Sequence, residues 1–167
     1  ATPANQDVAF LQFTSGSTSH PKGVQVGHDN LLANLRLIHD RMELGQPGDR
    51  AVTWLPHFHD MGLVGFLLAP MAAQLSVDYL GTRDFAMRPR LWPALISRNK
   101  GTISFSPSFG YALCSRRLRS SDLEQLDLSS WRIAGVGAEP IRPDVLEQFA
   151  SALKPAGFRP QAFLPSY

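Results

Sequence analysis

The chain has 167 residues, of which 44% are apolar and 18% charged, a composition typical of a globular domain with a hydrophobic core. Its formal net charge of +2 is too small to favour nucleic acid as a partner, and its single cysteine, Cys114, excludes an internal disulfide. The sequence has neither a signal-peptide pattern nor an apolar run long enough to span a membrane. We therefore expect a cytoplasmic protein with no membrane span and no nucleic-acid partner.

Strand-like and helix-like stretches alternate along the whole chain. A strand is predicted over residues 8–13, a short strand or hairpin over 23–27, and a helix over 30–44 with Asp29 as its N-cap. Further strands are predicted over 51–55, 75–80, 102–106, 131–136 and 161–164, and further helices over 61–73, 89–99, 109–118 and 143–153. The helix over 61–73 is almost entirely apolar and is expected to be buried on most sides. Such alternation predicts an α/β fold, a mostly parallel sheet flanked by helices.

Four loops follow predicted strands, and ligands of parallel α/β sheets bind where strands run out into loops. They span residues 14–23, 56–62, 106–109 and 135–140. If the strands are parallel, these loops converge on one edge of the sheet.

The first of these loops reads TSGSTSHPKG from Thr14 to Gly23. Small residues let backbone N–H groups approach anionic oxygens, hydroxyls donate hydrogen bonds, and Lys22 adds a positive charge, so the loop favours a nucleotide polyphosphate. Clusters of Ser, Thr, Gly and Pro are also common in loops without a function. A Walker-type site is disfavoured because its second glycine would fall on Pro21 and Lys22 is followed by Gly23 rather than by Ser or Thr.

That loop, its continuation to Leu31 and three later segments resemble, in order and spacing, the motifs of the adenylate-forming enzymes. This superfamily comprises acyl-CoA synthetases, firefly luciferase and nonribosomal-peptide adenylation domains. The later segments read WLPHFHDMGL over 54–63, GVGAEPI over 135–141 and FLPSY over 163–167. The HDMG run that begins at His59 and the SPSFGY segment over 106–111 are most similar to fatty acyl-AMP ligases.

The resemblance implies ATP-dependent activation of a long-chain fatty acid to an acyl-adenylate, with release of pyrophosphate and later transfer to an acyl carrier protein or CoA. ATP and Mg²⁺ would be the cofactors, and no protein nucleophile is needed. A non-catalytic nucleotide-binding or interaction module is the alternative. A Rossmann-type dehydrogenase is disfavoured because no GxGxxG opens a helix after the first strand. A zinc site at His57 and His59 is disfavoured because Met61 and Gly62 occupy the remaining ligand positions, so we expect no metal ligands in the chain.

The resemblance also assigns roles to residues. It implies catalytic roles for His59, beside the acyl carboxylate and the reacting phosphate, and for Lys22, whereas Asp60 is expected to cap the helix that begins at Met61. The implied nucleotide-binding residues are Thr14, Ser15, Gly16, Ser17, Thr18 and Lys22 at the phosphates, Gly137, Ala138, Glu139 and Pro140 as a flat shelf under adenine, and Tyr167 stacked on the base. The candidates for the acyl pocket are Phe66, Phe105, Phe109 and Tyr111, each of which could equally be a core residue.

By the same resemblance, residues 1–167 are the central segment of the large N-terminal AMP-binding domain. The segment would form a single domain, incomplete at both ends, without the C-terminal domain whose lysine contacts the reacting carboxylate. We therefore expect the 167 residues alone to be inactive and to bind nucleotide weakly, and we expect unpaired sheet edges to favour self-association.

Overall fold

The computed structural model describes residue 4, residues 7–13, the backbone of Thr14 and residues 22–166. The chain forms two compact units, one up to Leu44 and the other from Gly45 onward, and each is described by itself. Among the described residues, no helix combines the length and the apolar character that a membrane crossing requires.

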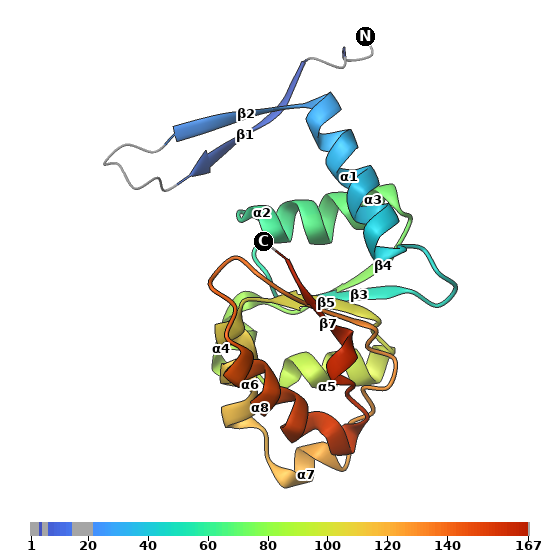
Figure 1. Cartoon of the computed structure of the whole chain (residues 1–167), viewed down its shortest axis with the longest axis vertical. Helices are drawn as coiled ribbons and strands as arrows, with labels where there is room; N and C mark the ends of the chain where they lie inside the picture. The colour runs from blue at the N-terminus through green and yellow to red at the C-terminus, as the bar shows by residue number, and fades with distance from the viewer. Residues whose placement is uncertain (1–3, 5–6, 15–21, 167) are drawn as a thin grey trace. The chain divides into compact units, whose positions relative to one another are not determined.

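The first unit consists of a hairpin and one helix (Figure 1). Strand β1 (Val8–Thr14) pairs antiparallel with β2 (Lys22–Gly27), and helix α1 (His28–Met42) follows directly. The N-cap of α1 is Gly27, whose N–H donates to the Asn30 side chain at 3.1 Å, so the prediction of Asp29 as the cap is wrong. The assignment of the strand over 8–13 to the mostly parallel sheet is also wrong, because β1 pairs antiparallel with its neighbour in sequence, β2, and Phe13 is 65% exposed.

The second unit is built on a five-stranded sheet in which every neighbouring pair is parallel. Its strands, in spatial order, are β4 (Ser76–Tyr79), β3 (Arg50–Thr53), β5 (Ile103–Ser106), β6 (Ile133–Val136) and β7 (Phe163–Pro165). The chain first winds outward from β3 to β4 and then crosses back to β5, on the other side of β3. The direction in which successive strands are added to the sheet therefore reverses between β3 and β5.

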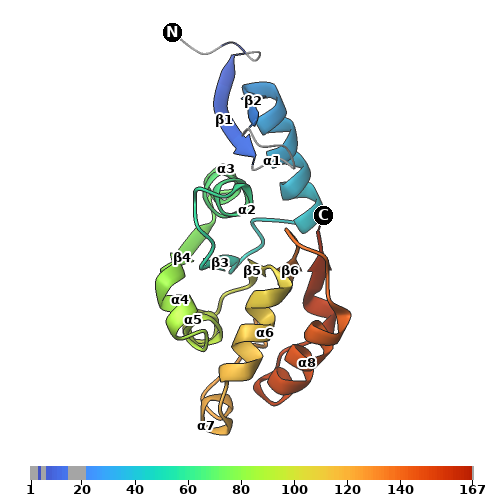
Figure 2. The same cartoon turned by 90° about the vertical axis from the view of Figure 1, so that its left-hand side faces the viewer.

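Helices cover both faces of this sheet. In Figures 1 and 2, α4 (Thr82–Met87), α5 (Leu91–Asn99), α6 (Ser108–Arg117) and α8 (Pro143–Leu153) lie on one face, with α7 (Ser120–Leu123) beyond them. The core on this side is aromatic: Trp92, Tyr111, Trp131 and Phe149 are fully buried and meet mostly edge to face. Cys114 is buried among them, and burial raises the pKa of its thiol to about 12. Two short 3₁₀ turns, η2 (Lys154–Ala156) and η3 (Pro160–Ala162), lead into β7.

The other face is covered by a helical run that changes its winding midway. Helix α2 (Asp60–Leu63) continues as the π-helical segment η1 (Val64–Leu68) and then as α3 (Ala69–Ala72). Pro70 has no N–H to donate to the carbonyl of Phe66, and the Tyr79 hydroxyl donates to that carbonyl at 2.7 Å. Of the residues of this run, Gly62, Phe66, Ala69 and Pro70 are buried. The helix therefore buries one side, and the prediction that residues 61–73 are buried on most sides is wrong.

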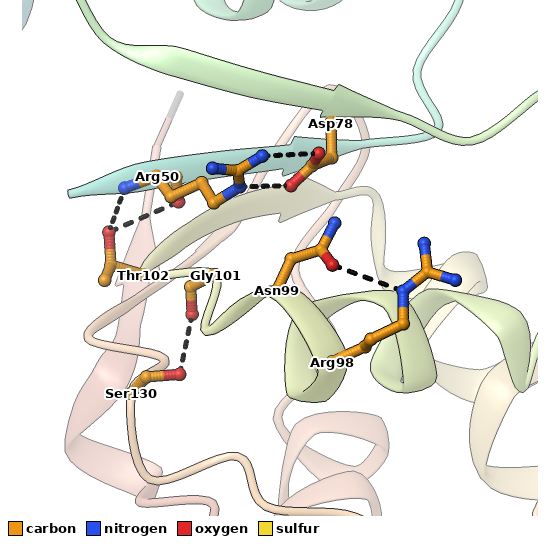
Figure 3. A network of polar contacts seen from close by, with 7 residues as sticks. All are labelled: Arg50, Asp78, Arg98, Asn99, Gly101, Thr102 and Ser130. Carbon is orange, nitrogen blue, oxygen red and sulfur yellow. Dashed lines mark hydrogen bonds and ion pairs between the residues drawn. The ribbon is translucent and has the colours of Figure 1, made fainter. Parts of the chain in front are cut away.

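Polar side chains join the amino ends of β3, β5 and β6 to one another, and join the amino end of β3 to β4. The Arg50 guanidinium makes two hydrogen bonds to Asp78 across β3 and β4, and the Arg50 amide donates to Thr102 at 3.0 Å (Figure 3). Asp49, whose side chain is 3% exposed, accepts two hydrogen bonds from Arg132, at 2.9 and 2.7 Å, and one from Thr102 at 2.9 Å. We call Asp49, Arg50, Asp78, Thr102 and Arg132 the amino-edge clamp.

Candidate functional site

The carboxyl ends of the parallel strands carry the loops that the sequence singled out. Ligands of open α/β sheets bind beyond these ends, at the place where the winding changes direction. In this sheet that place lies between β3 and β5, so the loops after these two strands, residues 54–59 and Pro107, flank it. The loop after β6, residues 137–142, comes next along the same edge.

His59 lies at the end of the loop after β3 and is the N-cap of α2. Its Nδ1 is 3.3 Å from the amide of Met61 and 2.8 Å from Oδ1 of Asp60. Asp60 also accepts from the Met61 amide, at 2.7 Å, but it is the first residue of the helix, so the expected capping position belongs to His59. Because both contacts engage Nδ1 and the side chain is half exposed, Nε2 is the ring nitrogen positioned to meet a ligand.

A tight backbone contact shapes the same loop. A Cβ atom on Gly62 would collide with the carbonyl oxygen of Pro56, so only glycine lets the first turn of α2 fold back against the end of β3. His57 packs edge to face on Tyr79, with ring centroids 4.9 Å apart. Between the two histidines, Phe58 is 89% exposed. The sequence reasoning did not single out Phe58, although an aromatic residue between two histidines after a buried strand is a signal that could have identified it.

The loop after β6 has a strained backbone. A Cβ atom on Gly137 would collide with the carbonyl oxygen of Ser166, whose own amide donates to Val136 at 2.8 Å. Ala138 has a φ of 63°, in the left-handed region that non-glycine residues rarely adopt. Such strain is concentrated at functional sites. The predicted adenine shelf over 137–140 thus begins at a glycine whose backbone lies close against Ser166, the residue after β7.

The same loop is tied to helix α6. Oε1 of Glu139 accepts a hydrogen bond from the amide of Phe109 at 2.7 Å. The Ser108 hydroxyl lies 3.5 Å from the Pro140 carbonyl, to which it donates, and accepts from the Arg142 amide at 3.3 Å. The start of α6 is therefore joined to the loop after β6 at the carboxyl edge.

The four aromatic candidates for an acyl pocket have different surroundings. Phe66 and Tyr111 are buried, and the Tyr111 hydroxyl donates to the Gly135 carbonyl at 2.8 Å. Phe105 is half-buried, and its ring covers Gly135 on the neighbouring strand, leaving no space for a Cβ there. Phe109 is 52% exposed and meets the buried ring of Trp54 edge to face, with centroids 5.8 Å apart. Phe109 is thus the candidate with the largest accessible surface.

Part of the predicted phosphate-binding set lies outside the described residues, namely Ser15, Gly16, Ser17 and Thr18, and so does Tyr167. Of the remainder, Thr14 ends β1 opposite Lys22, which begins β2 with an exposed side chain. Strand β1 is not a strand of the parallel sheet, so the parallel strands give no reason to place the loop over 14–23 with the other three loops. Within the part of the chain that the structure describes, no group of three His, Cys, Asp or Glu side chains could hold a metal ion.

Comparison with known proteins places the chain among enzymes that bind AMP. The family model of the AMP-binding enzymes matches residues 1–160. The chain is 44% identical over 161 residues to the medium-chain-fatty-acid acyl-carrier-protein ligase JamA of Moorena producens, a match that covers 96% of this chain and 27% of that protein.

Solved structures give the same result. A structure from a study of fatty acyl-adenylate ligases of E. coli and L. pneumophila is 56% identical, with a TM-score of 0.95 over all of this chain and 30% of that one. The fatty acyl-adenylate ligase of L. pneumophila, in complex with acyl adenylate and pyrophosphate, is 44% identical, with a TM-score of 0.91 over 98% of this chain and 29% of that one. This chain therefore spans less than a third of the length of these relatives. With its parallel α/β sheet and its ordered set of loop motifs, it belongs to the AMP-binding enzyme family.

Proposed function

We propose that the protein containing this chain joins a fatty acid to the AMP moiety of ATP, releasing pyrophosphate, and passes the acyl group to an acyl carrier protein or CoA. The observation that carries the proposal is the carboxyl edge of the sheet. There the exposed His59 and the strained shelf over 137–140 lie on the loops after β3 and β6, and the exposed ring of Phe109 lies in the first turn of α6, which follows the strand between them, β5. The names of the relatives, ligases of fatty acids, support the acyl substrate.

In the proposed reaction a carboxylate oxygen of the fatty acid attacks the α-phosphorus of ATP. A new P–O bond forms, the bond to the bridging oxygen breaks, and its electron pair leaves with pyrophosphate. The chain supplies positioning and charge rather than a nucleophile. His59 would donate from Nε2 to the reacting carboxylate or α-phosphate, and Lys22, with Thr14, Ser15, Gly16, Ser17 and Thr18, would hold the departing phosphates.

The remaining assignments concern the adenine and the acyl chain. Residues 137–140 would lie flat against the adenine, since a glycine and an alanine leave room for a ring, with Tyr167 stacked on it. Phe109 and Phe105 would contact the acyl chain, and Phe66 and Tyr111 would support them from the core. Mg²⁺ would share the negative charge of the ATP phosphates.

We further propose that the 167 residues are the central segment of an N-terminal AMP-binding domain and do not complete the reaction alone. The relatives are more than three times as long as the region they share with this chain, which supports this assignment.

The test is fatty-acid-dependent exchange of labelled pyrophosphate into ATP by the full-length protein, with hydroxylamine trapping of the acyl-adenylate as a second measurement. We expect exchange that requires both the fatty acid and Mg²⁺, and an acyl hydroxamate as the trapped product. ATP binding without exchange, over a series of fatty acids from medium to long chains, would contradict the proposal and favour a non-catalytic nucleotide-binding module.

A further inference from the structure

Glu139 makes a contact that the nucleotide role implied by the family does not require. Its carboxylate does not point into open solvent but accepts a hydrogen bond from the amide of Phe109, thirty positions away in sequence, at 2.7 Å. The Glu139 side chain therefore connects the shelf over 137–140 with the first turn of α6.

Helix α6 needs such an acceptor. The first amides of any helix lack intrahelical partners, and a side-chain oxygen at the N-cap usually accepts from one of them. The N-cap of this ten-residue helix is Pro107, whose side chain has no acceptor. Glu139 takes over this function from another loop, and its negative charge is favourable at a helix N-terminus.

A second set of hydrogen bonds connects the same two segments. The Ser108 hydroxyl, buried at the start of α6, accepts from the Arg142 amide and donates to the Pro140 carbonyl, so the backbone that follows Glu139 is attached to the helix at two points. Ala138, next to Glu139, holds a φ of 63°, a conformation that persists only where its surroundings impose it. The shelf and the helix start therefore form one unit.

We propose that Glu139 is a positioning residue that couples the adenine shelf to the acyl pocket through the amide of Phe109, whose ring is the most exposed of the acyl-pocket candidates. This inference rests on the proposed function. A nucleotide bound on the shelf restrains the Glu139 backbone. The hydrogen bond between the Glu139 carboxylate and the Phe109 amide then restrains Phe109, the residue proposed to face the acyl chain. Binding of ATP and of the fatty acid is then coupled.

The kinetic test compares Glu139→Gln, which keeps the Oε1 acceptor, with Glu139→Ala, which removes it, in the full-length protein. We expect Glu139→Ala to lower kcat/KM about tenfold for the fatty acid as well as for ATP, and Glu139→Gln to recover most of this loss, since an amide oxygen still accepts but without the charge. The matched control is Glu147→Ala on the exposed side of α8, which should match the wild type. An effect of Glu139→Ala on the KM for ATP alone, without recovery in Glu139→Gln, would overturn the proposal in favour of a direct nucleotide contact.

Hydrogen–deuterium exchange at the start of α6 gives a measurement that does not depend on turnover. We expect added ATP to slow exchange of the peptide that contains the Phe109 amide in the wild type and in Glu139→Gln, but not in Glu139→Ala. Equal protection in all three proteins would contradict the coupling. A wild type that shows no pyrophosphate exchange would instead refute the proposed function, so the two failures are distinguishable.

Discussion

The amino edge and the carboxyl edge of the sheet, where the two ends of its strands lie, differ in how their side chains are paired and in how strained their backbone is. At the amino edge, the charged side chains of the amino-edge clamp are paired with one another. The Asp49 carboxylate accepts hydrogen bonds from Arg132, from Thr102 and from the Gln46 amide. At the carboxyl edge, His57, Phe58 and His59 are exposed, Ala138 has a positive φ, and two glycines sit where any Cβ would collide with a carbonyl. Polar groups whose hydrogen bonds are satisfied stabilise a fold, whereas a strained backbone and exposed polar side chains are typical of functional sites.

The largest expected effect is on catalysis, through His59 at the carboxyl edge and through Lys22 in the first unit. His59→Ala or Lys22→Ala should reduce pyrophosphate exchange by the full-length protein about a thousandfold, the scale of losing one group that stabilises charge in the transition state. The matched controls are His39→Ala on α1 and Lys154→Ala in η2, both exposed residues outside the proposed site. If His59→Ala and Lys22→Ala retained the exchange rate of their controls, the residue assignments would fail.

The amino edge should show the reverse pattern. Asp49→Asn removes the charge that pairs with Arg132 and should lower the free energy of unfolding by roughly 3 kcal/mol at pH 7, while the KM values for ATP and fatty acid stay unchanged. Burial raises the pKa of the Asp49 carboxyl, but hydrogen bonds from Arg132 and Thr102 outweigh it, so the pKa lies below its ordinary value of 3.8. The charge therefore stabilises the fold at neutral pH, and the stabilisation is lost as the pH falls below 3.8 through the lowered value.

Urea unfolding followed by tryptophan fluorescence tests this, because Trp92 and Trp131 are buried in the adjoining core. The difference between wild type and Asp49→Asn should shrink as the pH is lowered from 5 to 3. A constant difference over that range would show that the charge of Asp49 is not its source.

Two glycines three positions apart, Gly62 and Gly65, give a smaller and more local comparison. Gly62→Ala places a methyl group against the Pro56 carbonyl and should destabilise the protein by about 2 kcal/mol, whereas nothing lies within 4 Å of a Cβ on Gly65. Gly65→Ala should therefore stabilise the helical run by about 0.5 kcal/mol through the lower entropy of the unfolded chain. Thermal unfolding of both variants measures the effect, and equal shifts would mean that the loop after β3 is not closed as described.

The parallel sheet was predictable because short strand-like stretches alternate with helix-like stretches from residue 51 onward. The strand over 8–13 was placed in the wrong sheet because an apolar run does not say which strand it pairs with, and the alternating residues after Lys22 offered a nearer partner. Helices α4 and α7 were missed because they have six and four residues, too few for a helical period to show.

The candidate site was predictable as a set of loops but not as a set of contacts. The GVGAEPI segment led to a shelf over 137–140, yet neither the positive φ of Ala138 nor the hydrogen bond from the Phe109 amide to Glu139 follows from sequence, because both depend on how two loops thirty residues apart meet. The burial of Tyr111 was equally hidden, since an aromatic on a helix can face a pocket or the core.

The most direct test of the central claim is hydrogen–deuterium exchange of the full-length protein with a nonhydrolysable acyl-adenylate analogue. The carboxyl edge should become protected over residues 56–60, 106–109 and 137–140, while exchange at the amino edge, over residues 46–50, 76–78 and 130–132, should stay unchanged. Protection confined to the amino edge, or none at either edge at saturating analogue, would contradict the assignment of the carboxyl edge as the adenylation site.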